Sequence, residues 1–174
     1  MILGGQHMER TKRRVSESRA RLVRVMMPQD ANFSGNVFGG TILKMVDEIS
    51  YVSATRHCRT NVVTASLDKM DFLSPVRIGD LLTLESSINA AWHSSMEVGV
   101  RVTAEDVRTG EVRHTGSSYL TVVALGVDGR PTMIPELVLE TPEDVRRNNE
   151  ANERRRKRIE LEAAKVVPGM DKRL

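Results

Sequence analysis

Residues 30–54, DANFSGNVFGGTILKMVDEISYVSA, combine residue types that could carry out chemistry. Asn36 and the pair Gly39 and Gly40 come directly before a predicted helix, and Asp47 lies inside it. A helix start carries N–H groups without intrahelical partners, and glycines let a ligand approach this backbone closely. Such N–H groups can stabilise a carbonyl oxygen that gains negative charge during acyl transfer. A glycine turn that only lets helix and sheet pack closely would give the same pattern.

The helix that carries Asp47 is predicted to be amphipathic. It should begin near Gly40 or Thr41 and run for about 16 residues, with Asp47 at the border of the apolar face. Glu48 lies about 100° further round and is expected to face solvent. Asp47 is therefore either an acid at a half-buried seam or an ordinary surface acid. The predicted apolar face consists of Ile42, Met45, Val46, Ile49 and Ser53.

Short alternating segments with β-branched residues predict strands on both sides of this helix. One strand precedes it at 19–26, and four follow it at 61–73, 81–92, 95–106 and 111–125. Turn residues between the later strands predict that these follow one another as a meander. A largely antiparallel sheet that holds one central helix is an α+β fold.

The two ends of the chain differ from its central part in charge. Residues 1–24 carry seven Lys or Arg against two Glu, and residues 142–174 carry ten basic against seven acidic residues. We expect a disordered basic segment at 1–18, a folded domain at 19–140, and a charged, partly helical extension at 141–174, solvated on the surface. Nucleic-acid binding is not favoured, because the basic residues do not belong to the folded domain.

Composition is typical of a globular protein. The 174 residues are 40% hydrophobic, which is enough for one core, although only 3% are aromatic. No apolar run approaches the roughly 20 residues that cross a membrane, and no signal-peptide core is visible. Cys58 is the only cysteine, so neither an internal disulfide nor a cysteine-rich metal site is expected. We expect a cytoplasmic protein that binds no metal.

The segment MPQDANFSGNVFGGTILKMVDE closely resembles the signature of the hotdog-fold acyl-CoA thioesterases, specifically the group of brain acyl-CoA hydrolase and the bacterial YciA-type enzymes. The resemblance continues through TRHCRTNVVTASLDKMDFLSPVRIGDLLTLESSINAAWHSSMEVGVRV and covers roughly residues 20–137. It implies a curved antiparallel sheet wrapped around the central helix, with chains paired into dimers and often assembled as trimers of dimers. It also implies an enzyme that hydrolyses fatty acyl-CoA to a free fatty acid and coenzyme A.

The resemblance assigns roles to the opening motif. It implies that Asp47 is catalytic, either as a general base for water or as a nucleophile that forms a transient anhydride. Asn36 would face the thioester from the partner subunit. The Gly40 N–H would form the oxyanion site, and Gly39 beside it would contact the substrate. Because such a site is shared between subunits, the chain is expected to act as a homo-oligomer.

Coenzyme A would enter as part of the substrate, and no separate cofactor is expected. Ser94 and Ser95, in the segment WHSSMEV, match positions where the family carries small polar residues near coenzyme A. A simple polar hairpin turn explains these serines nearly as well. Arg56, Arg59 and Arg77 are candidates for contact with the phosphates, or they are ordinary solvated charges.

The acyl group would lie between the central helix and the partner subunit, in a channel that Leu43, Met45 and Tyr51 are expected to line. Thr64, on the next strand beside the start of the helix, is not assigned to the site. The competing hypothesis is a non-catalytic acyl-CoA-binding regulatory module whose basic tail contacts nucleic acid. The presence of both Asn36 and Asp47 favours the enzyme, because a pure binder needs no carboxylate near an anionic ligand.

Overall fold

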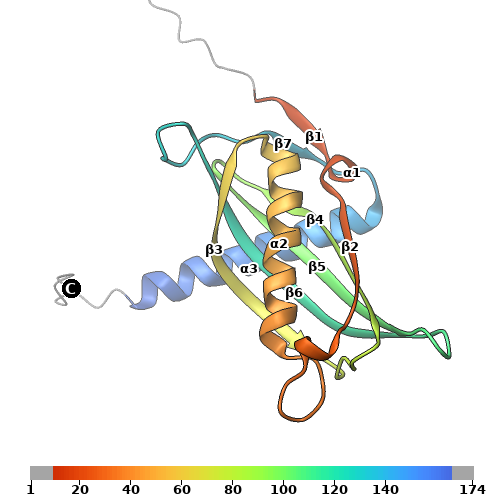
Figure 1. Ribbon diagram of the computed structural model, residues 1–174. Coiled ribbons are helices and arrows are strands. Elements are labelled where there is room, and N and C mark those ends of the chain that lie inside the picture. The colour runs from red at the N-terminus through yellow and green to blue at the C-terminus, as the bar shows by residue number, and fades with distance from the viewer. Residues whose placement is uncertain (1–9, 166–174) are drawn as a thin grey trace, which may run out of the picture.

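The computed structural model describes residues 10–165 of the chain. One long helix, α2 (Gly39–Cys58), lies in front of a sheet, and another, α3 (Pro142–Lys165), crosses behind it (Figure 1). Two short helical segments, α1 (Val15–Ser18) and η1 (Pro28–Asp30), precede α2. The strands are β1 (Lys12–Arg14), β2 (Ala20–Val25), β3 (Asn61–Phe72), β4 (Leu81–Ala91), β5 (Ser95–Asp106), β6 (Glu111–Leu125) and β7 (Glu136–Val138).

The main sheet has five antiparallel strands in the order β2-β4-β5-β6-β3. The predicted meander is correct for β4, β5 and β6, which pair in sequence order. It is wrong for β3, which pairs with β6 at the far edge of the sheet instead of with β4. The strands before and after α2 occupy opposite edges because the helix that joins them lies across the face between them. This arrangement is the predicted α+β architecture, with the sheet around one central helix.

The predicted apolar face of α2 packs against the inner face of the sheet, and its aliphatic side chains are at most 3% exposed. Ser53 completes this face through a hydrogen bond of 2.6 Å between its hydroxyl and that of Ser86 on β4. The helix has 20 residues rather than about 16, because it ends only where Arg59 adopts a left-handed backbone conformation with φ of 58°. Within residues 10–165, no helix is long and apolar enough to cross a membrane.

The N-terminal segment is more ordered than the sequence predicts. The predicted disordered segment at 1–18 includes residues 1–9, which lie outside the described residues, but residues 12–18 form β1 and α1. Val15 and Ser18 are buried, and the Ser18 hydroxyl accepts a hydrogen bond of 3.2 Å from the N–H of Ile88 on β4. β1 also pairs in parallel with β7. The folded part of the chain therefore begins before residue 19.

Within the predicted C-terminal extension, residues 142–165 form one helix of 24 residues on the outer face of the sheet, and residues 166–174 lie outside the described residues. Most side chains of this helix are exposed, as expected for a solvated extension, but one side of it packs against the sheet. Its start is capped reciprocally by Thr141 and Asp144. The Thr141 hydroxyl accepts a hydrogen bond from the Asp144 N–H at 3.1 Å, and the Asp144 carboxylate accepts one from the Thr141 N–H at 3.0 Å. Ala151 is fully buried against the sheet.

A buried carboxylate holds α3 to the sheet. Glu97 on β5 is 1% exposed and accepts hydrogen bonds of 3.0 and 2.7 Å from the Arg154 guanidinium and one of 3.0 Å from the Asn89 amide. Further along α3, the Arg158 guanidinium donates to the Asp68 carboxylate on the edge strand β3. These contacts are polar, and hydrophobic periodicity could not predict them.

Candidate active site

Asp47 lies in the middle of α2, on a side of the helix that its own sheet leaves exposed. Its Oδ1 accepts a hydrogen bond of 2.6 Å from the Thr64 hydroxyl on β3. This contact fixes the orientation of the carboxylate. Alternation along the strand does not reveal this contact, because a β-bulge directly after Thr64 interrupts the pattern from which side-chain direction is predicted.

The start of α2 has no side-chain cap. Its N-cap residue is Phe38, which has no polar side chain to accept a hydrogen bond from the first turn. The Thr41 N–H donates to the Phe38 carbonyl at 2.9 Å, but within residues 10–165 the N–H groups of Gly39 and Gly40 have no acceptor. Two backbone donors and the positive end of the helix dipole are therefore available to a ligand.

The two glycines differ in what surrounds them. A Cβ atom at Gly40 would lie 2.4 Å from the Phe38 ring, whereas a Cβ atom at Gly39 would lie 3.5 Å from the Phe72 ring. The first distance is a clash and the second is an ordinary van der Waals contact. The Phe38 ring therefore lies directly against the Gly40 backbone, and a larger residue at position 40 would require this exposed ring to move.

A cavity of about 370 Å³ opens at the start of α2. The loop before the helix contributes Asn32 and Asn36 to it. The Asn32 side-chain oxygen accepts hydrogen bonds from the Ser34 N–H at 2.8 Å and the Asn36 N–H at 3.2 Å, which holds the loop in shape. The remaining lining residues are mostly apolar and come from the loop before α2, from α2 itself, from the end of β3 and from the segment after it: Val37, Gly39, Ile42, Phe72, Leu73, Ser74, Pro75 and Val76.

Asp47 and the start of α2 cannot act on the same carbonyl group within one copy of the chain. They are seven residues apart, which is about 10 Å along a helix. No hydrogen bond joins Asp47 to Asn32 or Asn36 in the described part of the chain. One copy therefore holds two separate features: a carboxylate on the middle of the helix, and a pair of donors with a cavity at its start.

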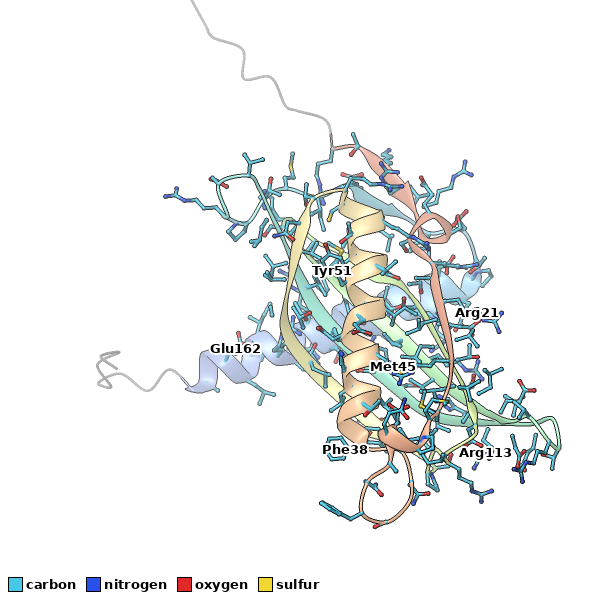
Figure 2. All side chains as sticks on the ribbon, in the orientation of Figure 1. Arg21, Phe38, Met45, Tyr51, Arg113 and Glu162 are labelled. Carbon is cyan, nitrogen blue, oxygen red and sulfur yellow. The ribbon has the colours of Figure 1, made fainter. Side chains whose placement is uncertain are left out.

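Two of the three predicted acyl-channel residues lie on the same row of α2 as Asp47, whereas Met45 is buried in the core against the sheet. Leu43, Asp47 and Tyr51 are spaced by four residues, so their side chains follow one another along one side of the helix. Leu43 is half-buried, and Tyr51 is 49% exposed. Figure 2 shows Tyr51 on the flank of α2 towards β3.

Only one of the three predicted phosphate contacts lies near the cavity of its own copy. Arg77 forms an isolated β-bridge with Asn36. Arg56 is 16 residues from Gly40, which is about 24 Å along α2, and its guanidinium donates to the Arg19 carbonyl. Arg59 ends the helix beyond it.

Ser94 and Ser95 lie in the tight hairpin between β4 and β5. The Ser94 carbonyl accepts a hydrogen bond of 2.9 Å from the Ala124 N–H, and the Ser95 carbonyl accepts one of 2.8 Å from the Trp92 N–H. The second bond closes the hairpin, and the first ties it to β6. Neither serine lines the cavity at the start of α2. Among residues 10–165, no cluster of three or more His, Cys, Asp or Glu could hold a metal ion.

The acyl-CoA hydrolase of Staphylococcus aureus, solved with butyryl coenzyme A, coenzyme A and coenzyme A disulfide, is structurally similar. The two chains are 36% identical with a TM-score of 0.81, over 89% of this chain and 96% of that one. Variants of that enzyme replace an asparagine, an aspartate or a threonine by alanine, the asparagine 15 residues before the aspartate and the threonine 17 after it. Asn32, Asp47 and Thr64 have the same two spacings, whereas Asn36 is 11 residues before Asp47.

Sequence and structure comparisons agree on the relatives of this chain. A family model described as the thioesterase superfamily matches residues 34–111. The uncharacterized acyl-CoA thioester hydrolase YkhA of Bacillus subtilis is 40% identical over 151 residues, which are 84% of this chain and 88% of that protein. A crystal structure of an apo-hexameric acyl-CoA thioesterase covers 90% of this chain and 99% of its own, with 36% identity and a TM-score of 0.85. The chain therefore belongs to the thioesterase superfamily, among the acyl-CoA thioesterases with the hotdog fold.

Proposed function

We propose that this protein hydrolyses the thioester of fatty acyl-CoA to a free fatty acid and coenzyme A, in a site shared by two copies of the chain. Asp47 of one copy acts on a thioester whose carbonyl oxygen is held at the start of α2 in the other copy. The observation that carries the proposal is the 2.6 Å hydrogen bond between Thr64 and Asp47, which orients a carboxylate on the exposed side of α2. Membership of the acyl-CoA thioesterases supports the substrate class.

Asp47 can act in either of two ways. As a general base, it takes a proton from a water molecule whose oxygen attacks the thioester carbonyl. As a nucleophile, it attacks the carbonyl carbon itself and forms an anhydride, which water then hydrolyses. In both routes the C–S bond breaks and the thiolate of coenzyme A leaves. The Thr64 hydroxyl keeps one carboxylate oxygen occupied and leaves the other free to react.

The start of α2 supplies the oxyanion site. The N–H groups of Gly39 and Gly40 have no acceptor within residues 10–165, so they are free to donate to the thioester oxygen as its negative charge grows. Loss of one donor of this kind typically lowers kcat by about 10² to 10³. The uncapped N-terminus of the helix supports this role, because a side-chain cap would occupy the same donors.

We assign the polar group beside the thioester to the loop before α2. The sequence predicts Asn36, while Asn32 has the spacing to Asp47 of the asparagine replaced in the Staphylococcus aureus hydrolase. Both residues line the cavity. Asn32→Ala and Asn36→Ala should therefore be compared in parallel, and the variant with the lower kcat identifies the residue that contacts the thioester.

A twofold dimer would bring the predicted phosphate contacts to the site from the second copy. If two α2 helices run antiparallel with Asp47 level with Gly40 of the other copy, Arg56 lies level with the other copy's loop before α2. Arg77 is near that loop within its own copy. The roles of Arg56, Arg59 and Arg77 towards the phosphates, and of Ser94 and Ser95, stay predictions.

The edge strand β3 is the surface where we place this dimer. It has 12 residues and only one strand neighbour among the described residues, and long exposed edges readily pair with another chain. Four large apolar side chains on this strand or directly after it are between 41% and 61% exposed: Val63, Leu67, Phe72 and Leu73. A second copy paired there would extend the sheet and place the two α2 helices side by side. Three such dimers would make a hexamer, the form of the solved apo-hexameric relative.

The regulatory alternative has less support than the sequence suggested. The basic residues of α3 are largely paired with acids of the same helix: Arg146 with Glu143 and Glu150, and Arg156 with Glu153. These contacts reduce the positive charge that a nucleic-acid phosphate would meet. Salt-dependent binding of nucleic acid would support the alternative.

No separate cofactor enters the proposed reaction, since coenzyme A arrives as part of the substrate. The cytoplasmic location also stays a prediction, and fractionation of the source cells would test it.

Thiol release from acyl-CoAs of increasing chain length tests the proposal. We expect turnover in the wild type and a fall of about 10³-fold in kcat for Asp47→Asn, within the usual range for a general base. Glu48→Gln is the matched control, since Glu48 is the next residue and is exposed, with only a long ion pair of 3.7 Å to Lys44. Absence of wild-type turnover on every acyl-CoA, with binding retained, would refute the enzyme and favour the regulatory module.

A further inference from the structure

The C-terminal end of α3 projects beyond the sheet on which the rest of the helix lies. A helix of 24 residues is about 36 Å long, whereas five strands span only about 20–24 Å. Arg158 already reaches Asp68 on the edge strand β3. The seven residues that follow Arg158 therefore lie past the edge of the sheet. Figure 2 shows Glu162 on this projecting end, outside β3.

Burial along α3 changes at the same point. Ala151, Arg154 and Arg158, which follow one another at helical spacing, are buried or half-buried against the sheet. Glu162 continues this stripe, and it is exposed, as are all described side chains from 159 to 164. The side of α3 that packs on the sheet thus extends past the edge of the sheet, where this copy of the chain has no strand beneath it.

Two large apolar side chains flank the exposed continuation of the stripe. Ile159 and Leu161 lie on either side of Glu162 on the helix, and they are 52% and 63% exposed. An overhang of seven residues is about 10 Å, or two strand spacings. If a second copy extends the sheet at β3, the overhang covers the first two strands of that copy's outer face.

We infer that the overhang of α3, residues 159–165, is an interaction surface for a second copy of this chain, the copy that pairs along β3. This inference rests on the dimer in the proposed function and goes beyond it, because it places a second contact on the opposite side of the sheet from the active site. By twofold symmetry each copy contributes one overhang, and the two overhangs cross the seam in opposite directions. The seam is then held on both faces, by α2 inside and by α3 outside.

The double variant Ile159→Gln/Leu161→Gln tests this surface in the full chain. Glutamine is a good helix former, so the helix should persist while the apolar contacts are lost. We expect the dissociation constant of the dimer, measured by sedimentation velocity over a dilution series, to rise at least about tenfold. Val145→Gln is the matched control, because Val145 is 45% exposed on the same helix but lies at its other end, and it should leave the constant unchanged.

Amide hydrogen exchange gives a second readout that needs no substitution. Residues 159–165 should exchange more slowly in concentrated, assembled protein than in protein diluted below the dissociation constant. Equal exchange in both samples, or equal dissociation constants for the double variant and the control, would overturn the inference. If the double variant separated hexamers into dimers that stayed intact, the inference would also be overturned, because the overhang would then contact a neighbouring dimer and not the copy paired along β3. Wild-type thioesterase activity is measured separately, and its absence would refute the proposed function without changing these outcomes.

Discussion

The two long helices of this protein lie on opposite faces of one sheet, and their N-termini are built in opposite ways. α3 begins with a reciprocal cap in which Thr141 and Asp144 satisfy each other's backbone N–H groups. α2 begins after Phe38, which has no capping side chain, and the N–H groups of Gly39 and Gly40 have no acceptor within residues 10–165. The first helix start contributes to stability, and the second leaves donors for a ligand.

The carboxylates on the two faces differ in the same way. Glu97, under α3, is almost fully buried and has its charge matched by Arg154. Asp47, on α2, is exposed and has a hydroxyl partner, Thr64, but no ion pair in the described part of the chain. A fully paired carboxylate holds structure together, whereas a carboxylate held by one hydroxyl stays able to react. The outer face should therefore control stability and the inner face should control turnover.

The largest effect on stability is expected for Arg154→Met. This change leaves Glu97 buried without its cation, and the loss of one partner of a buried pair costs about 3–5 kcal/mol. Urea unfolding measures the cost. The turnover number of the folded fraction should stay at the wild-type value, because Arg154 lies on the face opposite Asp47.

The double variant Glu97→Leu/Arg154→Met is the control for that prediction. Replacement of both partners by apolar groups of similar size is often close to neutral. It should recover most of the lost stability. A double variant as unstable as the single one would show that the charge pair is not the cause.

Gly40→Ala should strongly lower turnover and leave stability almost unchanged, the opposite of what is expected for Arg154→Met. The new methyl group meets the Phe38 ring, which is exposed and can move, but it also covers the backbone donor, so we expect kcat to fall by about 10²-fold. Alanine favours helix over glycine, so the free energy of unfolding should be unchanged or slightly higher. Gly39→Ala is the matched comparison and should lose less activity, because its Cβ makes only an ordinary contact with Phe72.

The sequence predicted α2 and the family of the protein well. The spacing of Ile42, Met45, Val46 and Ile49 predicts α2 and its buried face, and the glycine pair marks its start. The resemblance to the acyl-CoA thioesterases supplied the family, which the comparisons confirm. These features are local or depend on one helical period, so a single sequence contains them.

The features that the sequence did not predict depend on contacts between residues far apart in the chain. Thr64 meets Asp47 only because a bulged edge strand lies beside α2, and the position of β3 next to β6 was not predicted. The packing of α3 was missed because Glu97 and Arg154, 57 residues apart, form a polar contact that no hydrophobic pattern reveals. Asn32 becomes a candidate only through the spacing of the residues replaced in the Staphylococcus aureus hydrolase, and the role of Asn36 stays a prediction.

Substitutions of the cap residues at the two helix starts should have different effects on stability and on kcat. Phe38→Ser introduces a cap on α2 and should stabilise the protein by about 1 kcal/mol while it lowers kcat, because the serine oxygen competes for the substrate's donors. Thr141→Ala removes the cap of α3 and should cost about 1 kcal/mol with kcat unchanged. Thermal unfolding and thiol release should be measured on both variants. An unchanged kcat in Phe38→Ser would contradict the claim that the donors at the start of α2 bind the substrate.

The smallest effect concerns pH and His57, near the end of α2. Burial lowers the pKa of His57 below its usual 6.5, although the hydrogen bond from its Nε2 to the Pro135 carbonyl at 3.1 Å opposes this. The neutral form is therefore favoured in the folded state, and its Nδ1 has no partner among the described residues. Stability should be fully present above pH 6.5 and should fall below it as the unfolded state takes up a proton, by at most about 0.8 kcal/mol at pH 6. His57→Gln should remove this part of the pH dependence of the unfolding temperature.

The central claim is that Asp47 of one copy and the start of α2 of another form one site, and mixing two inactive variants tests it most directly. Asp47→Asn and Gly40→Ala protein would be unfolded together in urea, refolded as a mixture, and assayed for thiol release. A mixed dimer has one intact site and one doubly altered site, so random pairing should restore about a quarter of the wild-type activity. Activity no higher than that of the separate variants, with mixed dimers present, would place both groups in the same copy and contradict the account.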